Sequence, residues 1–273
     1  MGEEQYHADP APMPSLSRGT ICDLIYRSPA HAWIDHPRLN PTWQPDVDKK
    51  FDVGQASHDA LLCGMERVQP LDFPDWRTKA ARDAREGVRS IGKLPVLVRQ
   101  YEKIERMVVA ARKFWKDCPD LDGFAFEHGT TEVSAFWLED STWCRVRWDW
   151  ISNDKRLIVD YKTTENAGAD WPRRSIVAHG LDIQDHWYRR GARAVIGGDP
   201  SFVFLVQEVD PPYAVQAFAL EPAFQEIGKA KCDVGLRIWR ECLERNEWPA
   251  YQNRIAYVEP NAWQMAEAEA MES

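Results

Sequence analysis

Two alternating stretches of the sequence decide the fold, and they read WCRVRWDWI over residues 143–151 and RLIVDYKT over residues 156–163. Apolar and polar side chains alternate along both stretches, which is typical of β-strands with one face toward a core. Alternation places Asp149 on one face of the first strand, and Asp160 and Lys162 together on one face of the second. The sequence therefore predicts a hairpin that carries two carboxylates and a lysine.

The register of this hairpin sets how close the two carboxylates come. A two-residue turn at residues 153–154 would place Asp149 opposite Ile158 and Arg147 opposite Asp160. The two aspartates are then diagonal neighbours about 7–8 Å apart at the backbone, and from this distance both carboxylates can reach one ion.

A preceding hairpin adds a third carboxylate to the same face. A two-residue turn at residues 139–140 pairs Glu132 with Arg147. Three neighbouring carboxylates repel one another, and a divalent cation removes that conflict. Oxygen ligands favour Mg²⁺ or Mn²⁺, and Lys162 can orient or deprotonate an attacking water and stabilise charge on a phosphate. The pattern predicts phosphodiester hydrolysis, and the alternative is an ordinary solvent-facing hairpin.

The rest of the chain predicts helices on both sides of a central, mostly antiparallel sheet. Apolar spacing predicts helices over residues 20–34, 53–65, 77–86, 95–117, 175–195 and 222–246. Alternation predicts further strands over residues 131–138, 202–208 and 214–220. No repeat or linker divides the chain, so we expect one α/β (α+β) domain over residues 1–273, with flexible ends at about 1–19 and 259–273.

Charge is distributed unevenly along the chain. The 34 basic and 43 acidic residues give a net charge of −9, which alone argues against a nucleic-acid partner. Residues 76–116 hold twelve basic residues and four acidic ones, so this window is +8 and the remainder is −17. Such a window fits a surface that binds a polyanion, but it also fits a solvated helical face with internal ion pairs.

Composition also limits the class and the cellular compartment of the protein. The six cysteines are scattered, and this spacing predicts neither a zinc knuckle nor an iron–sulfur motif but a reduced, cytoplasmic protein. No apolar run is long enough for a membrane span, and the first residues do not resemble a signal peptide. The thirteen tryptophans are expected mainly in the core.

The order of these motifs resembles the PD-(D/E)xK nuclease superfamily. Glu132-Val133-Ser134, Arg147-x-Asp149 and Asp160-Tyr161-Lys162 precede Gln184-x-x-x-Tyr188. This series resembles in particular the phage and prophage exodeoxyribonuclease VIII (RecE-like) exonucleases, and more distantly lambda exonuclease and RecB nuclease domains. FDVGQASH at residues 51–58 resembles the Gly-x-x-x-His helix of that branch, and EWPAY at 247–251 resembles its C-terminal signature. Trp148 stands where these nucleases often have proline.

The resemblance implies a fold and a set of site residues. The fold is a restriction-endonuclease-like core, in which a leading antiparallel hairpin opens a central mixed sheet flanked by helices. Asp149 and Asp160 would be the principal metal ligands, and His58 would approach the same metal from its helix. Glu132 would be a further acid near the metal, and Lys162 the catalytic lysine.

The resemblance also implies substrate contacts, an activity and partners. Gln184 and Tyr188, with Arg147, are expected to contact the DNA backbone or brace the site. The implied activity is Mg²⁺-dependent (or Mn²⁺-dependent) hydrolysis of linear double-stranded DNA from an end, 5′ to 3′, in phage-type recombination. Implied partners are DNA ends, a single-strand annealing protein and further copies of the chain in a ring. The alternatives are a structure-specific or single-strand nuclease of the same superfamily, or a non-catalytic DNA-end-binding protein.

Overall fold

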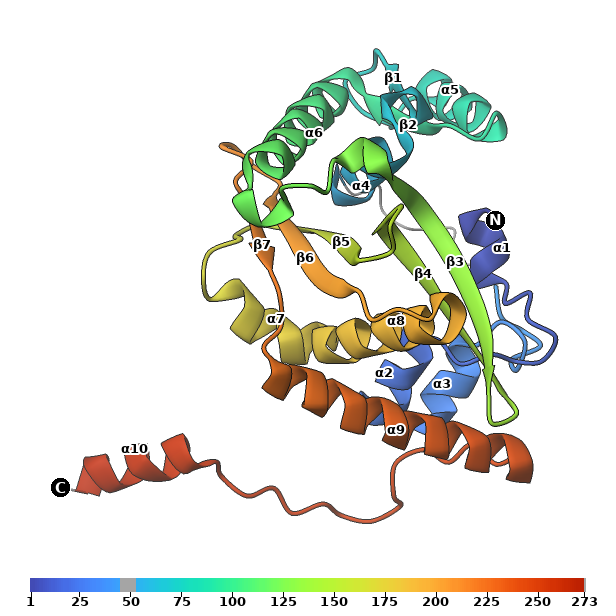
Figure 1. The fold of residues 1–273 in the computed structure, drawn as a ribbon, viewed down its shortest axis with the longest axis vertical. Coiled ribbons are helices and arrows are strands. Elements are labelled where there is room, and N and C mark those ends of the chain that lie inside the picture. The colour runs from blue at the N-terminus through green and yellow to red at the C-terminus, as the bar shows by residue number, and fades with distance from the viewer. Residues whose placement is uncertain (45–52, 273) are drawn as a thin grey trace.

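The computed structural model describes residues 1–44 and 53–272 (Figure 1). Its strands are β1 (Val68–Leu71), β2 (Leu94–Leu97), β3 (Gly129–Glu139), β4 (Thr142–Ser152), β5 (Leu157–Thr164), β6 (Ser201–Glu208) and β7 (Val215–Phe218). Its α-helices are α1 (Glu3–His7), α2 (Arg18–Tyr26), α3 (Pro29–Asp35), α4 (Val53–Cys63), α5 (Lys79–Ser90), α6 (Val98–Asp117), α7 (Trp171–His179), α8 (Leu181–Ile196), α9 (Pro222–Arg245) and α10 (Ala262–Glu272). Within the described residues, no helix is both long enough and apolar enough to cross a membrane.

The main sheet has the order β3-β4-β5-β6-β7. Strands β3, β4 and β5 form an antiparallel meander, β5 pairs with β6 in parallel, and β7 is antiparallel to β6. Helices lie on both sides of this sheet (Figure 1). The predicted mixed sheet with a leading antiparallel hairpin is therefore confirmed.

The connection between β4 and β5 is wider than we predicted. A two-residue turn at residues 153–154 would place Asp149 opposite Ile158, whereas Ile151 occupies that position. The Ser152 hydroxyl holds the wider turn by accepting two backbone N–H groups from the far side. The predicted register is wrong by two residues. An even displacement leaves the strand faces unchanged, but it moves the two aspartates from diagonal positions to positions directly across from each other.

The turn between β3 and β4 corrects the second predicted register. Asp140 and Ser141 both have left-handed backbones, with φ of 44° and 76°, as a two-residue hairpin turn of type I′ requires. This turn lies one residue later than we expected, so Ser134 rather than Glu132 stands opposite Arg147. Glu132 nevertheless stays on the face of Arg147, because this displacement is also two residues.

The two faces of the sheet pack into separate cores. Trp148, Phe204 and Trp187 belong to the core between the sheet and α2, α8 and α9. Trp150 and Trp115 belong to the core between the sheet and α4 and α6. These indoles are almost fully buried, as we expected for most of the tryptophans.

A small lobe stands above the sheet in Figure 1, formed by α4, β1, α5, β2 and α6. Strands β1 and β2 pair in parallel, and neither was predicted; residues 95–97 were expected in a helix. Each strand has four residues and contains a proline, Pro70 or Pro95, so the chain is too short there for alternation to show. Ala56 and Ile104 are buried in the core of this lobe.

Two helices that we predicted as continuous are each broken. The helix expected over residues 20–34 is interrupted before Pro29, which begins α3. The helix expected over residues 175–195 is interrupted at Gly180, where φ is 59°. A Cβ at Gly180 would lie 2.8 Å from the Cys22 sulfur, so both the backbone and the packing require glycine there.

The two ends of the chain differ. In the N-terminal segment, expected to be flexible, Tyr6, Asp9 and Leu16 are buried, and Leu16 bonds through its backbone to β4. These contacts argue against a loose N-terminal end. At the other end, Ile255 and Tyr257 are exposed, and α10 stands away from the body (Figure 1).

Candidate metal centre

Strands β4 and β5 separate where the predicted ligands lie. Their ladder pairs Ile151 with Ile158 and Trp150 with Val159. Beyond these pairs, the N–H of the residue after Asp160 donates to the Asp149 carboxylate at 2.8 Å. A side-chain oxygen therefore takes the place of a ladder carbonyl, which fixes Asp149 in the gap between the strands.

The alternation of side chains along β4 also breaks at Asp149. Trp148 packs into the core on the α8 side, whereas Trp150 packs into the core on the α6 side, although a regular strand would place both on one face. Across the ladder, Glu132 has a left-handed backbone with φ of 56°. Such a conformation costs a non-glycine residue about 1–3 kcal/mol and is typical of functional sites.

Three side chains converge at this kink. His58 on α4 places Nε2 3.1 Å from Asp149 Oδ2, and its Nδ1 lies 3.7 Å from Glu132 Oε1. One ligand atom from each of His58, Glu132 and Asp149 lies within 4.8 Å of the other two. Residues 51 and 52 of the motif that predicted the histidine helix lie outside the described residues, but α4 itself begins at Val53 as expected.

The second predicted aspartate ligand is engaged by neighbouring side chains. Lys162 Nζ lies 2.5 Å from Asp160 Oδ2, and the Gln184 amide on α8 donates to Oδ1. Burial and the Asp149 carboxylate raise the pKa of Asp160 to about 6, although Lys162 opposes this. The structure therefore brings Asp160, Lys162 and Gln184 together as predicted and places them beside the three converging side chains.

The charges of this centre depend on one another. Burial disfavours a charged His58, but Asp149 together with Asp59 and Glu132 outweighs burial and raises the pKa of His58 well above its ordinary value. At Asp149, burial is likewise outweighed by His58 together with Lys162 and the Tyr161 N–H, which lower the pKa of that carboxyl. Burial and Asp149 raise the pKa of Glu132 despite His58 and Arg147. Positive charge from the imidazolium thus stabilises a carboxylate cluster that would otherwise repel itself.

The donor set fits a divalent cation. His58 Nδ1 is buried and has no hydrogen-bond partner within residues 1–44 and 53–272, whereas Asp160 Oδ2 is held by Lys162. The imidazole nitrogen borders the cluster, as expected of a group that serves a bound ion. Carboxylate oxygens suit Mg²⁺ and Mn²⁺, and a single imidazole nitrogen is a common additional ligand. Glu132, Asp149 and His58 would hold such an ion, with Asp160 next to it.

Two residues predicted to contact DNA also make internal contacts. Arg147 donates from Nε to Glu132 at 2.6 Å and from a terminal nitrogen to Ser134 at 2.8 Å, so it braces the glutamate. The Tyr188 ring packs edge-on against Phe202. Burial, followed by nearby charges that include Asp160, raises the pKa of Tyr188 well above its ordinary value.

A basic pocket of about 690 Å³ borders Lys162, and sequence reasoning missed Arg18 and His179 among its members. Arg18 on α2 and Arg174 and His179 on α7 line it with Thr164. No local pattern signals such a group, because Arg18 and Lys162 are far apart in the chain. Its cations, Arg18, Lys162 and Arg174, outnumber its one acid, Glu165, so the pocket suits a phosphate next to the metal centre.

Residues 25–261 match a family described as "PDDEXK-like domain of unknown function (DUF3799)". The chain belongs to this PDDEXK-like family. The acids on β3, β4 and β5 lie together with the lysine on β5. Both the family and the site support a nuclease.

A solved structure agrees with this fold. A crystal structure of a "Putative exonuclease" from Eubacterium rectale has 12% sequence identity, with 97% of each chain covered and a TM-score of 0.61. At this identity the likeness supports the fold alone. A crystal structure of SSO0001 has 9% identity over 85% of this chain and 81% of its own, but its TM-score of 0.33 is too low to support an argument. No curated protein matches the chain.

Proposed function

We propose that this protein is a Mg²⁺-dependent exodeoxyribonuclease that degrades linear double-stranded DNA from an end, in the 5′-to-3′ direction. The observation that carries the proposal is the convergence of His58, Glu132 and Asp149 beside the Asp160–Lys162 pair. The end preference and polarity follow the resemblance to RecE-like exonucleases. A role in phage-type recombination, with an annealing protein and a ring of identical subunits, belongs to the same proposal.

The side chains around the centre have different roles in hydrolysis. A bound Mg²⁺ would polarise the scissile phosphate and lower the pKa of a coordinated water. Lys162 keeps an ammonium group next to the centre, where it can orient the attacking water and stabilise charge on the phosphate. Asp160 holds that ammonium, and Gln184 in turn holds Asp160, so the lysine is fixed before substrate arrives.

The surroundings of the lysine suit a nucleic-acid strand. Arg18 and Arg174 line the pocket that Lys162 borders, and both can pair with phosphate oxygens. On the other side, Arg147 keeps Glu132 oriented toward His58. The centre is therefore positively charged where a phosphate would lie and negatively charged where a cation would bind.

The test compares linear with covalently closed circular duplex DNA on a gel, with Mg²⁺, with Mn²⁺ and with EDTA. We expect loss of the linear duplex only, dependent on Mg²⁺ or Mn²⁺, and little turnover with Ca²⁺, whose bonds are longer and geometry looser. Substrates labelled at either 5′ or 3′ ends report polarity. Activity that survives EDTA would overturn the metal mechanism, and equal loss of circles would overturn the end requirement.

A further inference from the structure

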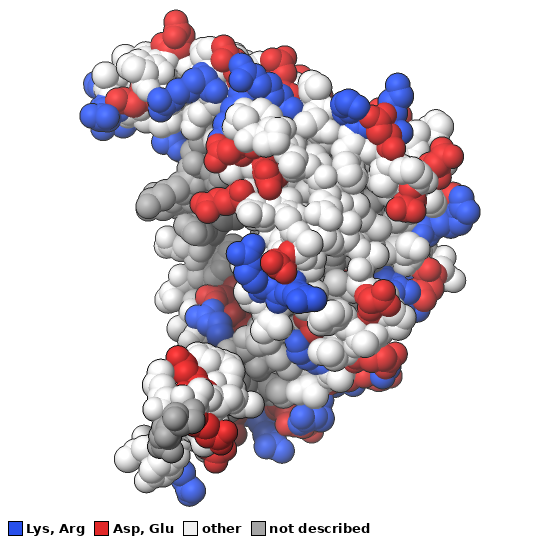
Figure 2. Space-filling view, turned by 90° about the vertical axis from the view of Figure 1, so that its left-hand side faces the viewer, with Lys and Arg blue, Asp and Glu red and all other residues white. Residues whose placement is uncertain are grey.

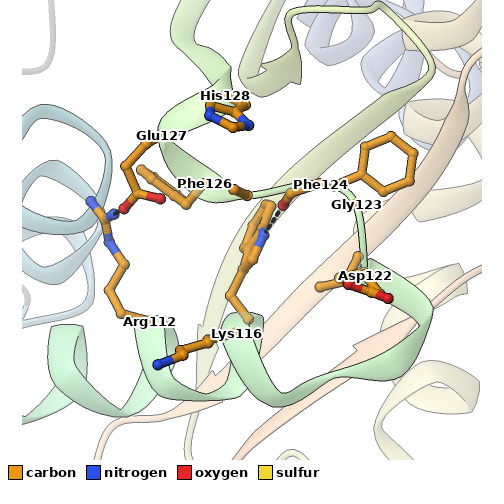
Figure 3. Close-up of a pocket in the computed structure, with 11 residues that line it drawn as sticks. Arg112, Lys116, Asp122, Gly123, Phe124, Phe126, Glu127 and His128 are labelled. Carbon is orange, nitrogen blue, oxygen red and sulfur yellow. Dashed lines mark hydrogen bonds and ion pairs between the residues drawn. The ribbon is translucent and has the colours of Figure 1, made fainter.

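The basic window at residues 76–116 divides into two classes of cations. Half of them are already neutralised by an acid within 4.0 Å: Arg77, Arg89, Lys103, Arg106, Arg112 and Lys113. Figure 3 shows one case, in which Arg112 is paired with Glu127, and its guanidinium also lies 3.6 Å from the Phe126 ring centroid. The remaining six have no ion pair in the part of the chain that the structure describes. The six paired cations therefore fit a solvated helical face, whereas the six without an ion pair fit a surface that binds a polyanion.

The unpaired cations are concentrated on α5. Lys79 and Arg82 are exposed on this helix, whereas Ala81 and Val88 on its opposite side are buried. Lys79 and Arg82 are three residues apart and therefore share one side of the solvent face, which also carries the exposed Asp83 and Glu86. Helix α6, in contrast, carries mostly cations that are paired with acids.

Arg85 gives α5 a preorganised cation. Its guanidinium lies 5.3 Å from the Trp76 ring centroid, and its Nε is buried with no hydrogen-bond partner among the described residues. Burial and the neighbouring Arg89 lower the pKa of Arg85, and Glu86 only partly opposes them. An anion at this position would supply the missing partner.

The lobe that carries α5 is joined to the metal centre. Helix α4, which carries His58, packs against α6 and β1 through Ala56 and Val68 in the same core. Figure 2 shows this lobe at the top of the molecule, projecting beyond the body, with Lys and Arg side chains next to Asp and Glu. A long polyanion held at the centre can therefore also contact the lobe.

We propose that the solvent face of α5, formed by Lys79, Arg82 and Arg85 with Trp76 beneath, binds the sugar-phosphate backbone of the duplex DNA that the metal centre cleaves. The inference rests on the proposed function and adds the surface that holds the substrate. Contacts of this kind carry no sequence information, so binding through α5 is equal for all sequences. It weakens steeply with salt, because each neutralised phosphate releases counterions.

The test measures binding of a fluorescein-labelled blunt duplex by anisotropy across a KCl series. All proteins carry Asp149→Asn, so that the duplex stays intact. The test variant is Arg82→Gln/Arg85→Gln, and the control is Arg106→Gln/Lys113→Gln, which removes the same charge from cations that already have acidic partners. We expect the slope of log K against log salt to become shallower by about two in the test variant only, at about 0.9 per phosphate contact.

A second pair of substitutions controls for a folding defect, because replacing Arg85 also removes its contact with the Trp76 ring. Lys79→Gln/Arg82→Gln alters exposed side chains alone and should flatten the slope similarly, with unchanged thermal unfolding. Equal slopes for both test pairs, the control and the parent would overturn the inference. If the wild type still degrades linear duplex with Mg²⁺ in that case, the proposed function stands and only the α5 surface fails. A wild type without metal-dependent cleavage would instead overturn the proposed function.

Discussion

Lys162 is the side chain that balances the buried charge of Asp160. Asp160 is 1% exposed, and Lys162 supplies the cation at 2.5 Å. The lysine itself is one-third exposed, so it can turn to water when its partner is removed. The two members of the pair are therefore unequal in their effect on stability, although both should be required for cleavage.

Replacing Lys162 and Asp160 separately should reveal this inequality. Lys162→Met leaves a buried carboxylate without its cation and should lower the free energy of unfolding by about 3 kcal/mol. Asp160→Asn removes the buried charge and should change the free energy of unfolding little. Urea unfolding at neutral pH measures both. A stable Lys162→Met protein, or an equal loss in Asp160→Asn, would contradict the assignment of this pair.

Asp185 is a buried carboxyl outside the centre with a measurable pH signature. Both of its oxygens are buried without a hydrogen bond among the described residues, and Arg189 lies 3.7 Å away. Burial, reinforced by Asp199, raises the pKa of Asp185 to about 6 despite Arg189. The folded protein therefore binds this proton more tightly than the unfolded chain, whose pKa is about 3.9.

Because of this raised pKa, the contribution of Asp185 to the free energy of unfolding falls as the pH rises from about 4 to about 6 and is constant above that range. Asp185→Asn removes the titration and should stabilise the protein at about pH 7.5 by up to about 3 kcal/mol. The gain should disappear at about pH 4, where the wild-type carboxyl is protonated in the folded state. Urea midpoints at both pH values test this, and a gain that is the same at both would show that Asp185 is not charged when buried.

The proximity of the candidate site residues could be predicted, because their motifs follow one another along the chain. His58, Asp149 and Lys162 lie together in the structure as the resemblance implied. The left-handed backbone at Glu132 could not be predicted, because strict alternation carries no sign of a kink. Arg18 was also missed, since its place beside Lys162 depends on packing between distant helices.

Helices α8 and α9 pack so closely that one position between them admits only glycine. A Cβ at Gly228 would lie 2.1 Å from the Asp182 carbonyl oxygen, which belongs to the backbone of α8 and cannot move alone. Gly87 on α5 has no neighbour within 4 Å of such a Cβ. The two glycines therefore provide a matched pair within helices.

The same substitution should have opposite effects at these two glycines. Gly228→Ala should lower the free energy of unfolding by about 2 kcal/mol or more, because it separates α9 from α8. Gly87→Ala should raise it by about 0.5–1 kcal/mol, because alanine loses less backbone entropy in an exposed helix. Chemical denaturation gives both values, and destabilisation by Gly87→Ala would contradict the exposed helical position of α5.

Long elements were predictable and short connections were not. Alternation located β3, β4, β5 and β6 to within a few residues, because each has eight or more. The registers were wrong by two because turn length depends on local bonds, such as those of the Ser152 hydroxyl. Strands β1 and β2 escaped prediction because four residues with a proline give no periodic signal.

The two ends of the chain contribute unequally to the whole molecule. Asp9 lies 3.0 Å from the buried Arg145 guanidinium, and the Leu16 backbone bonds to both sides of Cys144. Beyond residue 254, in contrast, Ile255, Tyr257 and other large apolar side chains are exposed. The first segment belongs to the folded body, whereas the last stands outside it.

Truncation should separate these two ends. Deleting residues 1–19 leaves Arg145 buried without its carboxylate and should cost about 3–5 kcal/mol of unfolding free energy. Deleting residues 254–273 should change it by less than about 0.5 kcal/mol. Thermal and urea unfolding of both truncated chains test this. A stable N-terminal deletion would show that the first segment does not support β4.

The proposed cleavage depends on the metal centre, and Asp149 is the residue that tests this centre most directly. Asp149→Asn keeps the shape of the side chain and an oxygen for the Tyr161 N–H, but it removes a charged ligand. Asp140→Asn makes the same change at the exposed turn of the same hairpin. The measurement is the rate at which each purified protein degrades linear duplex DNA with Mg²⁺. We expect Asp149→Asn to be folded but inactive and Asp140→Asn to be fully active; a wild-type rate for Asp149→Asn would contradict the proposed metal centre.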